Sequence, residues 1–228
     1  MQLVKFLVAA TTFFGMVSAQ EDKAIKDKYE IGEMVFSGPA FPGGKDIELK
    51  GTVEQIVAEL EKINPNYLDD FPKKEPEGPS EGKRLVIPGG PEETAVAQPK
   101  SVVKRDVETL RCDWWKYKAV LGDIMKALDK LEHLDGKCYV NYNSCVKVAC
   151  EKEAAIWWCN EEDSTNESTI HMTCANLARG VNEIVDRCRQ CDNFNSDKCT
   201  LSGQFYTWIW ENGGIGHSVN IEGKNKCP

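Results

Sequence analysis

The sequence predicts an α+β fold in which two helices cover one face of an antiparallel sheet of four to five strands, stapled by disulfides. Three observations lead to this prediction. All ten cysteines of the 228-residue chain lie beyond Arg111, and an even number of cysteines in a short secreted domain is typical of a disulfide framework. In the same region, two segments carry apolar residues at helical spacing, and further runs are rich in β-branched and aromatic residues. Helices packed on one face of a sheet bury both kinds of element.

The first 19 residues have the features of a secretory signal peptide. A charged start at Lys5 is followed by an apolar run from Phe6 to Val17. Small residues end this run, which predicts cleavage after Ala19. The alternative of a membrane anchor is disfavoured, because the run is too short to cross ~30 Å of hydrocarbon as a helix. We therefore expect a secreted, extracellular protein that is not embedded in a membrane.

Residues 20–71 are predicted to be a proregion, since they contain neither cysteine nor tryptophan. Apolar residues recur at helical spacing over residues 52–63, which begin with a capping box at Thr52. Residues 30–37 are expected to form a short strand. One helix and one strand bury little apolar surface alone. We therefore expect the proregion to be largely separate and partly disordered, and to assist folding by docking its helix on another surface.

Residues 72–105 are predicted to be a flexible linker. Proline and glycine occupy 10 of the 29 positions between residues 72 and 100, which is more than a packed core tolerates. The linker contains two dibasic pairs, Lys83-Arg84 and Lys104-Arg105. Dibasic pairs are often only solvated charge, but the second pair falls where the composition changes, in a chain routed for secretion. We therefore expect a kexin-type protease to cleave after Arg105.

Residues 106–228, the cysteine-rich domain, are predicted to hold five disulfides with a connectivity that spacing does not reveal. The cysteines are Cys112, Cys138, Cys145, Cys150, Cys159, Cys174, Cys188, Cys191, Cys199 and Cys227. The alternative of a zinc site has one half-site, Cys188 and Cys191, but no good second pair. In an oxidising compartment thiolates pair with each other first, so we expect no metal and no cofactor.

The elements of this domain follow from periodicity. Two helices are predicted from apolar residues that share one face, and Cys174 and Cys188 lie on the inward face of the second. The strands are predicted from β-branched or aromatic runs, the first two joined as a hairpin. The helices are expected at residues 117–134 and 173–190, and the strands at residues 145–150, 155–159, 204–210 and 217–221.

Four features of the domain share one pattern: the spacing Cys145-x-x-Val148-x-Cys150, the helical pattern from Cys174 to Cys191, the run Ser202-Gly203-Gln204 and the terminal Cys227. In these features the domain resembles the fungal killer-toxin-four family, small secreted α/β toxins first known from a smut-fungus virus. The segment from Ala155 to Asn160 is also similar to kexin-processed fungal secreted proteins. The resemblance implies a compact sandwich of antiparallel strands and two helices, and interference with calcium uptake in competitors.

The negative net charge argues against two functions, nucleic-acid binding and channel blocking. The whole chain carries a net charge of −8, which argues against binding to nucleic acid, since that requires a basic face. Residues 106–228 contain 14 basic and 19 acidic residues, a net charge of −5. Toxin members of the family are generally basic in the functional region. The acidic mouth of a cation channel would repel a negative surface, which argues against channel blocking.

No catalytic residue is expected. The histidines His133, His171 and His217 have no partner at metal-ligand spacing, so we expect surface side chains. The serine-hydrolase motif Gly-x-Ser-x-Gly is absent. Carboxylate pairs such as Glu161 and Glu162 lie in charged sequence and are expected to be solvated. The alternative is a small extracellular hydrolase, for example one directed at glycans, whose acid residues escape recognition.

The tryptophans are the candidate binding residues. Trp157 and Trp158 are consecutive in a predicted strand and must point to opposite faces, whereas Trp208 and Trp210 share a face. Helices cover only one face, so an exposed aromatic patch is expected, with full burial as the alternative. Asn166 begins a glycosylation sequon in a predicted acidic loop.

Together these features predict a secreted, proteolytically matured effector or killer-toxin-like protein that acts by binding. The expected partners are the kexin-type protease during maturation and an extracellular or cell-surface target, either protein or carbohydrate. The mature protein is expected to be a monomer.

Overall fold

The structure is a computed structural model that describes residues 25, 29–74, 84–86, 107–161, 169–191, 199–209, 215–224 and 227. Several residues singled out above lie outside this part of the chain: Ala19, Lys83, Lys104, Arg105, Asn166 and Trp210. For Arg84 and Trp208 only the backbone is described.

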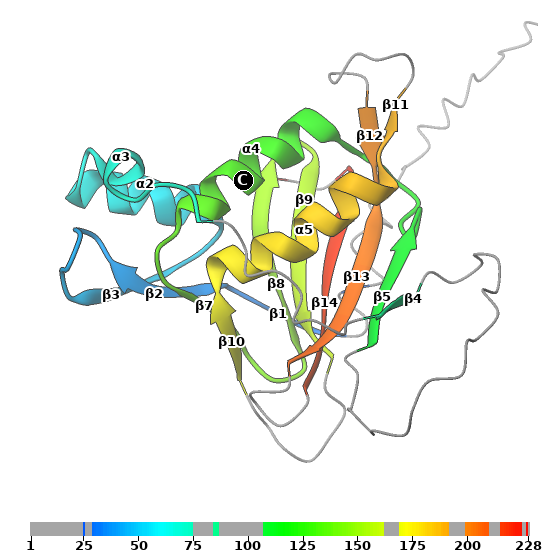
Figure 1. Cartoon of the computed structure of the whole chain (residues 1–228), viewed down its shortest axis with the longest axis horizontal. Coiled ribbons are helices and arrows are strands. Elements are labelled where there is room, and N and C mark those ends of the chain that lie inside the picture. The colour runs from blue at the N-terminus through cyan, green and yellow to red at the C-terminus, as the bar shows by residue number, and fades with distance from the viewer. Residues whose placement is uncertain are drawn as a thin grey trace, which may run out of the picture.

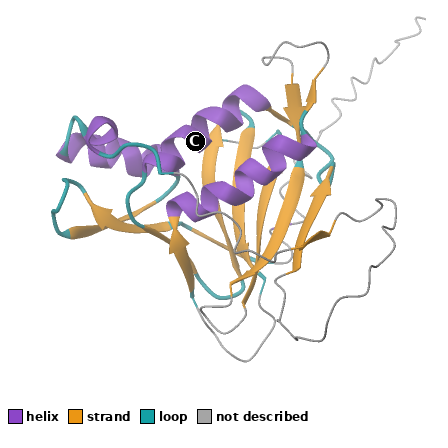
Figure 2. Cartoon of the chain, viewed as in Figure 1, coloured by secondary structure: helices purple, strands orange, loops and turns teal. Residues whose placement is uncertain are grey.

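The described part of the chain contains both helices and strands, and groups of strands are separated by helices (Figures 1 and 2). The helices are α2 (Val53–Ile63), α3 (Tyr67–Asp70), α4 (Leu121–His133) and α5 (Cys174–Cys188). The strands are β1 (Glu30–Gly32), β2 (Val35–Pro39), β3 (Asp46–Lys50), β4 (Arg84–Val86), β5 (Val107–Cys112), β6 (Ala119–Val120), β7 (Lys137–Val140), β8 (Ser144–Glu151), β9 (Ala154–Asn160), β10 (Ile170–Thr173), β11 (Gln190–Cys191), β12 (Cys199–Leu201), β13 (Gly203–Ile209) and β14 (Ile215–Glu222).

The main sheet has seven strands in the order β1-β8-β9-β14-β13-β5-β4. The five central strands are antiparallel, whereas β1 and β4 pair in parallel at the two edges. The α+β class is confirmed, but the sheet is larger than expected and mixed. The two additional strands, β1 and β4, come from the proregion and the linker. The single strand expected at residues 30–37 is divided into β1 and β2, which belong to different sheets, whereas β4 was not expected.

Alternation along the strands separates two faces of the main sheet. One face bears a row of apolar side chains across the central strands, formed by Val146, Trp158, Val219, Phe205 and Leu110 in register. Helices α4 and α5 contact this face and lie together in front of the sheet in Figure 2. The row is buried beneath them, because a sheet and two amphipathic helices bury their apolar faces against each other.

Helix α5 lies very close to the sheet. A Cβ atom on Gly180 would be 2.7 Å from Cγ2 of Val219 in β14. Real Cβ atoms do not approach other carbon atoms this closely, so the position requires glycine in the middle of the helix despite its lower helix propensity. Cys174 and Cys188, at the two ends of α5, are buried as expected.

All ten cysteines form disulfides, so the prediction of five bridges is confirmed. The pairs are Cys112–Cys188, Cys138–Cys174, Cys145–Cys159, Cys150–Cys227 and Cys191–Cys199. Two of these bridges join α5 to strands, one at each end of the helix. The bridges thus fix the helix on the sheet and also anchor the C-terminal end of the described chain.

The expectation that the proregion lies largely separate was wrong for residues 29–74, which we call the prosegment. Strand β2 pairs with β7, and β1 pairs with β8. Helix α2 packs against α4 and β8. The helix begins with the expected capping box at Thr52. Although β2 and α2 also have partners within the prosegment, their buried side chains belong to one core cluster with the cysteine-rich domain.

Among the described residues, no helix is both long enough and apolar enough to cross a membrane.

Candidate functional site

Trp157 and Trp158 do not form an exposed patch. They point to opposite faces of the sheet, as predicted, but both are buried. Trp158 lies in the core under the helices. Trp157 belongs to a second apolar cluster on the opposite face, with Cys145 and Cys159. The expectation of an exposed patch was wrong for this pair, because residues from both ends of the described chain cover the second face.

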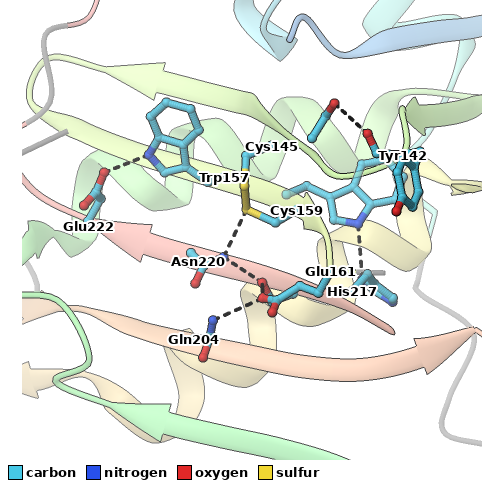
Figure 3. The surroundings of a disulfide bond; sticks show 12 residues. Tyr142, Cys145, Trp157, Cys159, Glu161, Gln204, His217, Asn220 and Glu222 are labelled. Atoms are coloured by element: carbon cyan, nitrogen blue, oxygen red, sulfur yellow. Dashed lines mark hydrogen bonds between the residues drawn. A yellow bond between two sulfur atoms is a disulfide. The ribbon is translucent and has the colours of Figure 1, made fainter. Parts of the chain in front are cut away.

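The indole N–H groups of the two tryptophans are satisfied inside the protein. Nε1 of Trp157 donates to Oε1 of Glu222 at 2.8 Å, and Nε1 of Trp158 donates to Nδ1 of His217 at 3.1 Å (Figure 3). His217 is therefore buried, contrary to the expectation of a surface histidine. A buried indole N–H requires an acceptor, and the antiparallel register brings β14 beside β9 to supply both.

A pocket lies on the face of the sheet opposite α4 and α5. Its volume is about 240 Å³. Four separate parts of the chain form its wall: the segment before β1, the loop after β5, the end of β9, and strands β13 and β14. The lining residues are Ile25, Tyr29, Trp114, Trp115, Cys159, Glu161, Gln204 and Asn220.

A hydrogen-bond network connects the polar side chains of this pocket. The Glu161 carboxylate accepts from Nε2 of Gln204 at 3.4 Å and from the Ser218 hydroxyl. The same hydroxyl accepts from Nδ2 of Asn220 at 3.0 Å, and Nδ2 lies 3.8 Å from Sγ of Cys159. Figure 3 shows Glu161 between Gln204 and Asn220. Gln204 and Asn220 are paired in register, so both side chains point to the same face.

Two buried polar atoms of the lining have no hydrogen-bond partner among the described residues. They are Oδ1 of Asn220, an acceptor, and Nε1 of Trp115, a donor. Asn220 is only 1% exposed. Leaving a buried donor or acceptor unsatisfied costs about 1–3 kcal/mol. A bound molecule with its own donors and acceptors would therefore complete this network.

Tyr29 lies against the carboxylate of Glu161. Burial raises the pKa of the Tyr29 phenol well above its usual value, and the negative charge of Glu161 raises it further. The phenol is therefore protonated at neutral pH and remains a hydrogen-bond donor next to a carboxylate. Because Tyr29 and Ile25 precede β1, the N-terminal part of the chain contributes one wall of the pocket.

A second, larger hollow lies beside α4. It has a volume of about 570 Å³ and is more open. Several of its charged side chains pair with one another, including Lys73 with Asp129 and Lys126 with Glu151 at 4.0 Å. Exposed pairs of this kind contribute little stability, and no buried polar atom of this lining lacks a partner among the described residues. The pocket at Glu161 is therefore the stronger candidate site.

The two cysteines of the candidate zinc half-site form disulfides. Cys188 bonds to Cys112 and Cys191 bonds to Cys199, so neither thiol remains to bind a metal. Within the described part of the chain, no cluster of three or more His, Cys, Asp or Glu side chains is arranged to hold a metal ion.

Glu161 was expected to be a solvated carboxylate, and no functional role was predicted for Tyr29, Trp115, Gln204 or Asn220. A signal for two of them exists. Polar residues alternate with apolar ones on β13 and β14, which places Gln204 and Asn220 on the face away from the helices. The other contributions come from loops and from the prosegment, and these depend on the tertiary fold.

Comparison of the chain with known protein families, curated proteins and solved structures finds no match.

Proposed function

We propose that this chain is a secreted, proprotein-processed effector of the killer-toxin-like type, which acts by binding an extracellular or cell-surface target at the Glu161 pocket. The five disulfides suit a protein that works in an oxidising compartment. The observation that carries the proposal is that two residues of the pocket wall, Asn220 and Trp115, each hold a buried polar atom with no partner among the described residues. Oδ1 of Asn220 would supply an acceptor for a ligand, and Nε1 of Trp115 would supply a donor.

The chemistry of the pocket favours a neutral carbohydrate as the group that binds. Trp114, which is 48% exposed, and Trp115 offer apolar ring surfaces. Glu161, Gln204 and Asn220 add a carboxylate and two amides. A sugar ring presents a C–H face and hydroxyl groups that both donate and accept. The volume is below the ~300–1,000 Å³ of sites for drug-sized molecules, so it suits a single ring of a larger glycan.

The pocket favours binding over hydrolysis. Glycosidases use two carboxyl groups placed about 5–9.5 Å apart, and the described lining contributes one, Glu161. The unpartnered atoms are hydrogen-bonding groups rather than nucleophiles. Binding through such groups needs no proton transfer.

Titration of the secreted protein with neutral cell-wall oligosaccharides tests the proposal, using tryptophan fluorescence for binding and chromatography for the sugar. We expect saturation at one site and recovery of unchanged sugar. Glu161→Gln should weaken binding about tenfold, since hydrogen bonds to charged groups contribute about 1.5–3 kcal/mol. The exposed Met125→Ala on α4 serves as the control. Shortened sugar products would contradict the proposal and favour the hydrolase, and no saturation with any glycan would refute a carbohydrate ligand.

A further inference from the structure

We propose that the prosegment is not lost on maturation: after cleavage at Lys104-Arg105, residues 29–74 stay bound to the cysteine-rich domain as a second, noncovalent chain. Both predicted dibasic sites lie after residue 74, so cleavage leaves the prosegment intact. It contains no cysteine, so its association depends on the contacts described next. This inference uses the predicted cleavage but does not depend on what the pocket binds.

Backbone pairing connects the prosegment to the cysteine-rich domain in two sheets. Strand β2 pairs with β7 from Val35↔Tyr139 to Ser37↔Lys137, and β1 pairs with β8 over three residues. Strand β2 thereby continues the sheet β10-β7-β2-β3. Departure of the prosegment would leave unpaired edges on β7 and β8 at once, and exposed edges promote aggregation.

Two glycines allow the backbones of the prosegment and the cysteine-rich domain to approach closely. A Cβ on Gly136 would lie 2.4 Å from the carbonyl oxygen of Ser37 and 2.6 Å from the ring of Phe36. On the prosegment side, a Cβ on Gly38 would lie 2.4 Å from the carbonyl oxygen of Asp135. Phe36 is fully buried. The contact is therefore as close as packing inside one domain.

The apolar side of α2 extends this interface. Its buried residues are Val53, Ile56, Val57 and Leu60, and the helix contacts α4 and β8. These side chains belong to the same core cluster as Leu128 and Leu131 of α4. Obligate interfaces have this apolar character, resembling a domain core divided between two chains.

Polar contacts complete the interface at the C-terminal end of α4. The backbone N–H of Lys74 donates to the carbonyl of Glu132 at 2.9 Å, which is one of the carbonyls that a helix end leaves unsatisfied. The Lys74 ammonium also pairs with Asp135, and the Asp135 N–H donates to the Tyr67 hydroxyl at 3.3 Å. The prosegment thus caps a helix of the cysteine-rich domain.

A further contact involves α2 and the sheet. Both carboxylate oxygens of Glu54 lie 3.3 Å from the backbone nitrogen of Cys150, which donates to them.

Retention of the prosegment also affects the pocket, because Tyr29 stays attached through β1. The two-chain protein therefore keeps a wall of the pocket that the cysteine-rich domain alone would lack.

The test replaces Lys104-Arg105 with the recognition sequence of a site-specific protease, so it does not depend on natural processing. The purified full chain is cleaved and then examined by size-exclusion chromatography and native mass spectrometry at micromolar concentration. We expect both fragments in one peak, with a native mass equal to their sum, and separation only in denaturant. Elution of residues 106–228 without the prosegment in native buffer would overturn the proposal.

Two phenylalanines of the prosegment provide a matched pair. Phe36→Ala removes a fully buried ring, whereas Phe41→Ala removes a ring that is 50% exposed. We expect Phe36→Ala to raise the dissociation constant of the cleaved complex about 100-fold or more, and Phe41→Ala to change it less than about threefold. Equal effects would contradict the interface. If the Phe36 variant does not fold, Glu54→Gln provides a milder change, expected to weaken association about tenfold.

Discussion

Removal of the Cys150–Cys227 disulfide is predicted to destabilise the protein more than removal of Cys191–Cys199. The first bridge joins residues 77 positions apart and the second joins residues 8 positions apart. If a bridge acts mainly by restricting the unfolded chain, loop entropy gives about 4.5 kcal/mol for the first and about 2.5 kcal/mol for the second. The other bridges shorten the free path in the unfolded chain, so the difference is at most about 2 kcal/mol.

The two bridges are comparable in burial at one end only. Cys150 and Cys199 are both buried, but Cys227 is half-buried whereas Cys191 is exposed, so replacement of the first bridge by alanine also loses slightly more packing. The assay is urea unfolding of the two double Cys→Ala variants beside the parent chain, with the free energy of unfolding taken by linear extrapolation. Equal losses, or a larger loss from the short loop, would refute the loop-entropy reasoning.

Three other predictions concern packing, binding and pH. Gly180→Ala should lower the free energy of unfolding by about 1–3 kcal/mol, since its methyl group would lie 2.7 Å from a side chain of β14. Gly122→Ala faces open space and should raise it by up to about 1 kcal/mol. Thermal unfolding in which both variants shift the midpoint in the same direction would contradict this. Trp115→Phe should weaken glycan binding about two- to tenfold in titration. Trp157→Phe loses a hydrogen bond to the buried Glu222 carboxylate and should mainly lower the free energy of unfolding in urea, by about 1.5–3 kcal/mol. The opposite pattern would show that Nε1 of Trp115 is not a donor to the ligand. Burial raises the pKa of Tyr67 from 10.0 to about 12, so the folded state favours the neutral phenol. This contribution to stability is present below pH 10 and is lost as the pH rises from 10 to 12. Tyr67→Phe should therefore lose less stability over that range than the parent protein, and identical stability profiles of the two between pH 9 and 12 would contradict this.

Local pattern predicted the elements whose partners are close in sequence. The hairpin of β8 and β9, the amphipathic helices and the opposite directions of Trp157 and Trp158 all follow from residue periodicity. The even cysteine count predicted five bridges, but not their pairing, because pairing depends on which cysteines the fold brings together.

The remaining features depend on contacts between distant parts of the chain. Phe36 packs against Gly136, 100 positions later. The apolar pattern of the prosegment predicts its helix but not the surface on which that helix packs. His217 is buried because the register of β14 places it beside Trp158. The pocket combines Tyr29, Glu161 and residues of two further segments. These residues are far apart in the sequence, so no local pattern predicts that they share one pocket.

The most direct test of the disulfide-fixed, exported scaffold is the intact mass of the protein collected from culture medium, treated with a thiol-alkylating reagent before and after reduction. We predict no added label on the unreduced protein and ten labels after reduction, one for each cysteine. Label on the unreduced protein would show free thiols and contradict the covalent framework, and with it the placement of the Glu161 pocket.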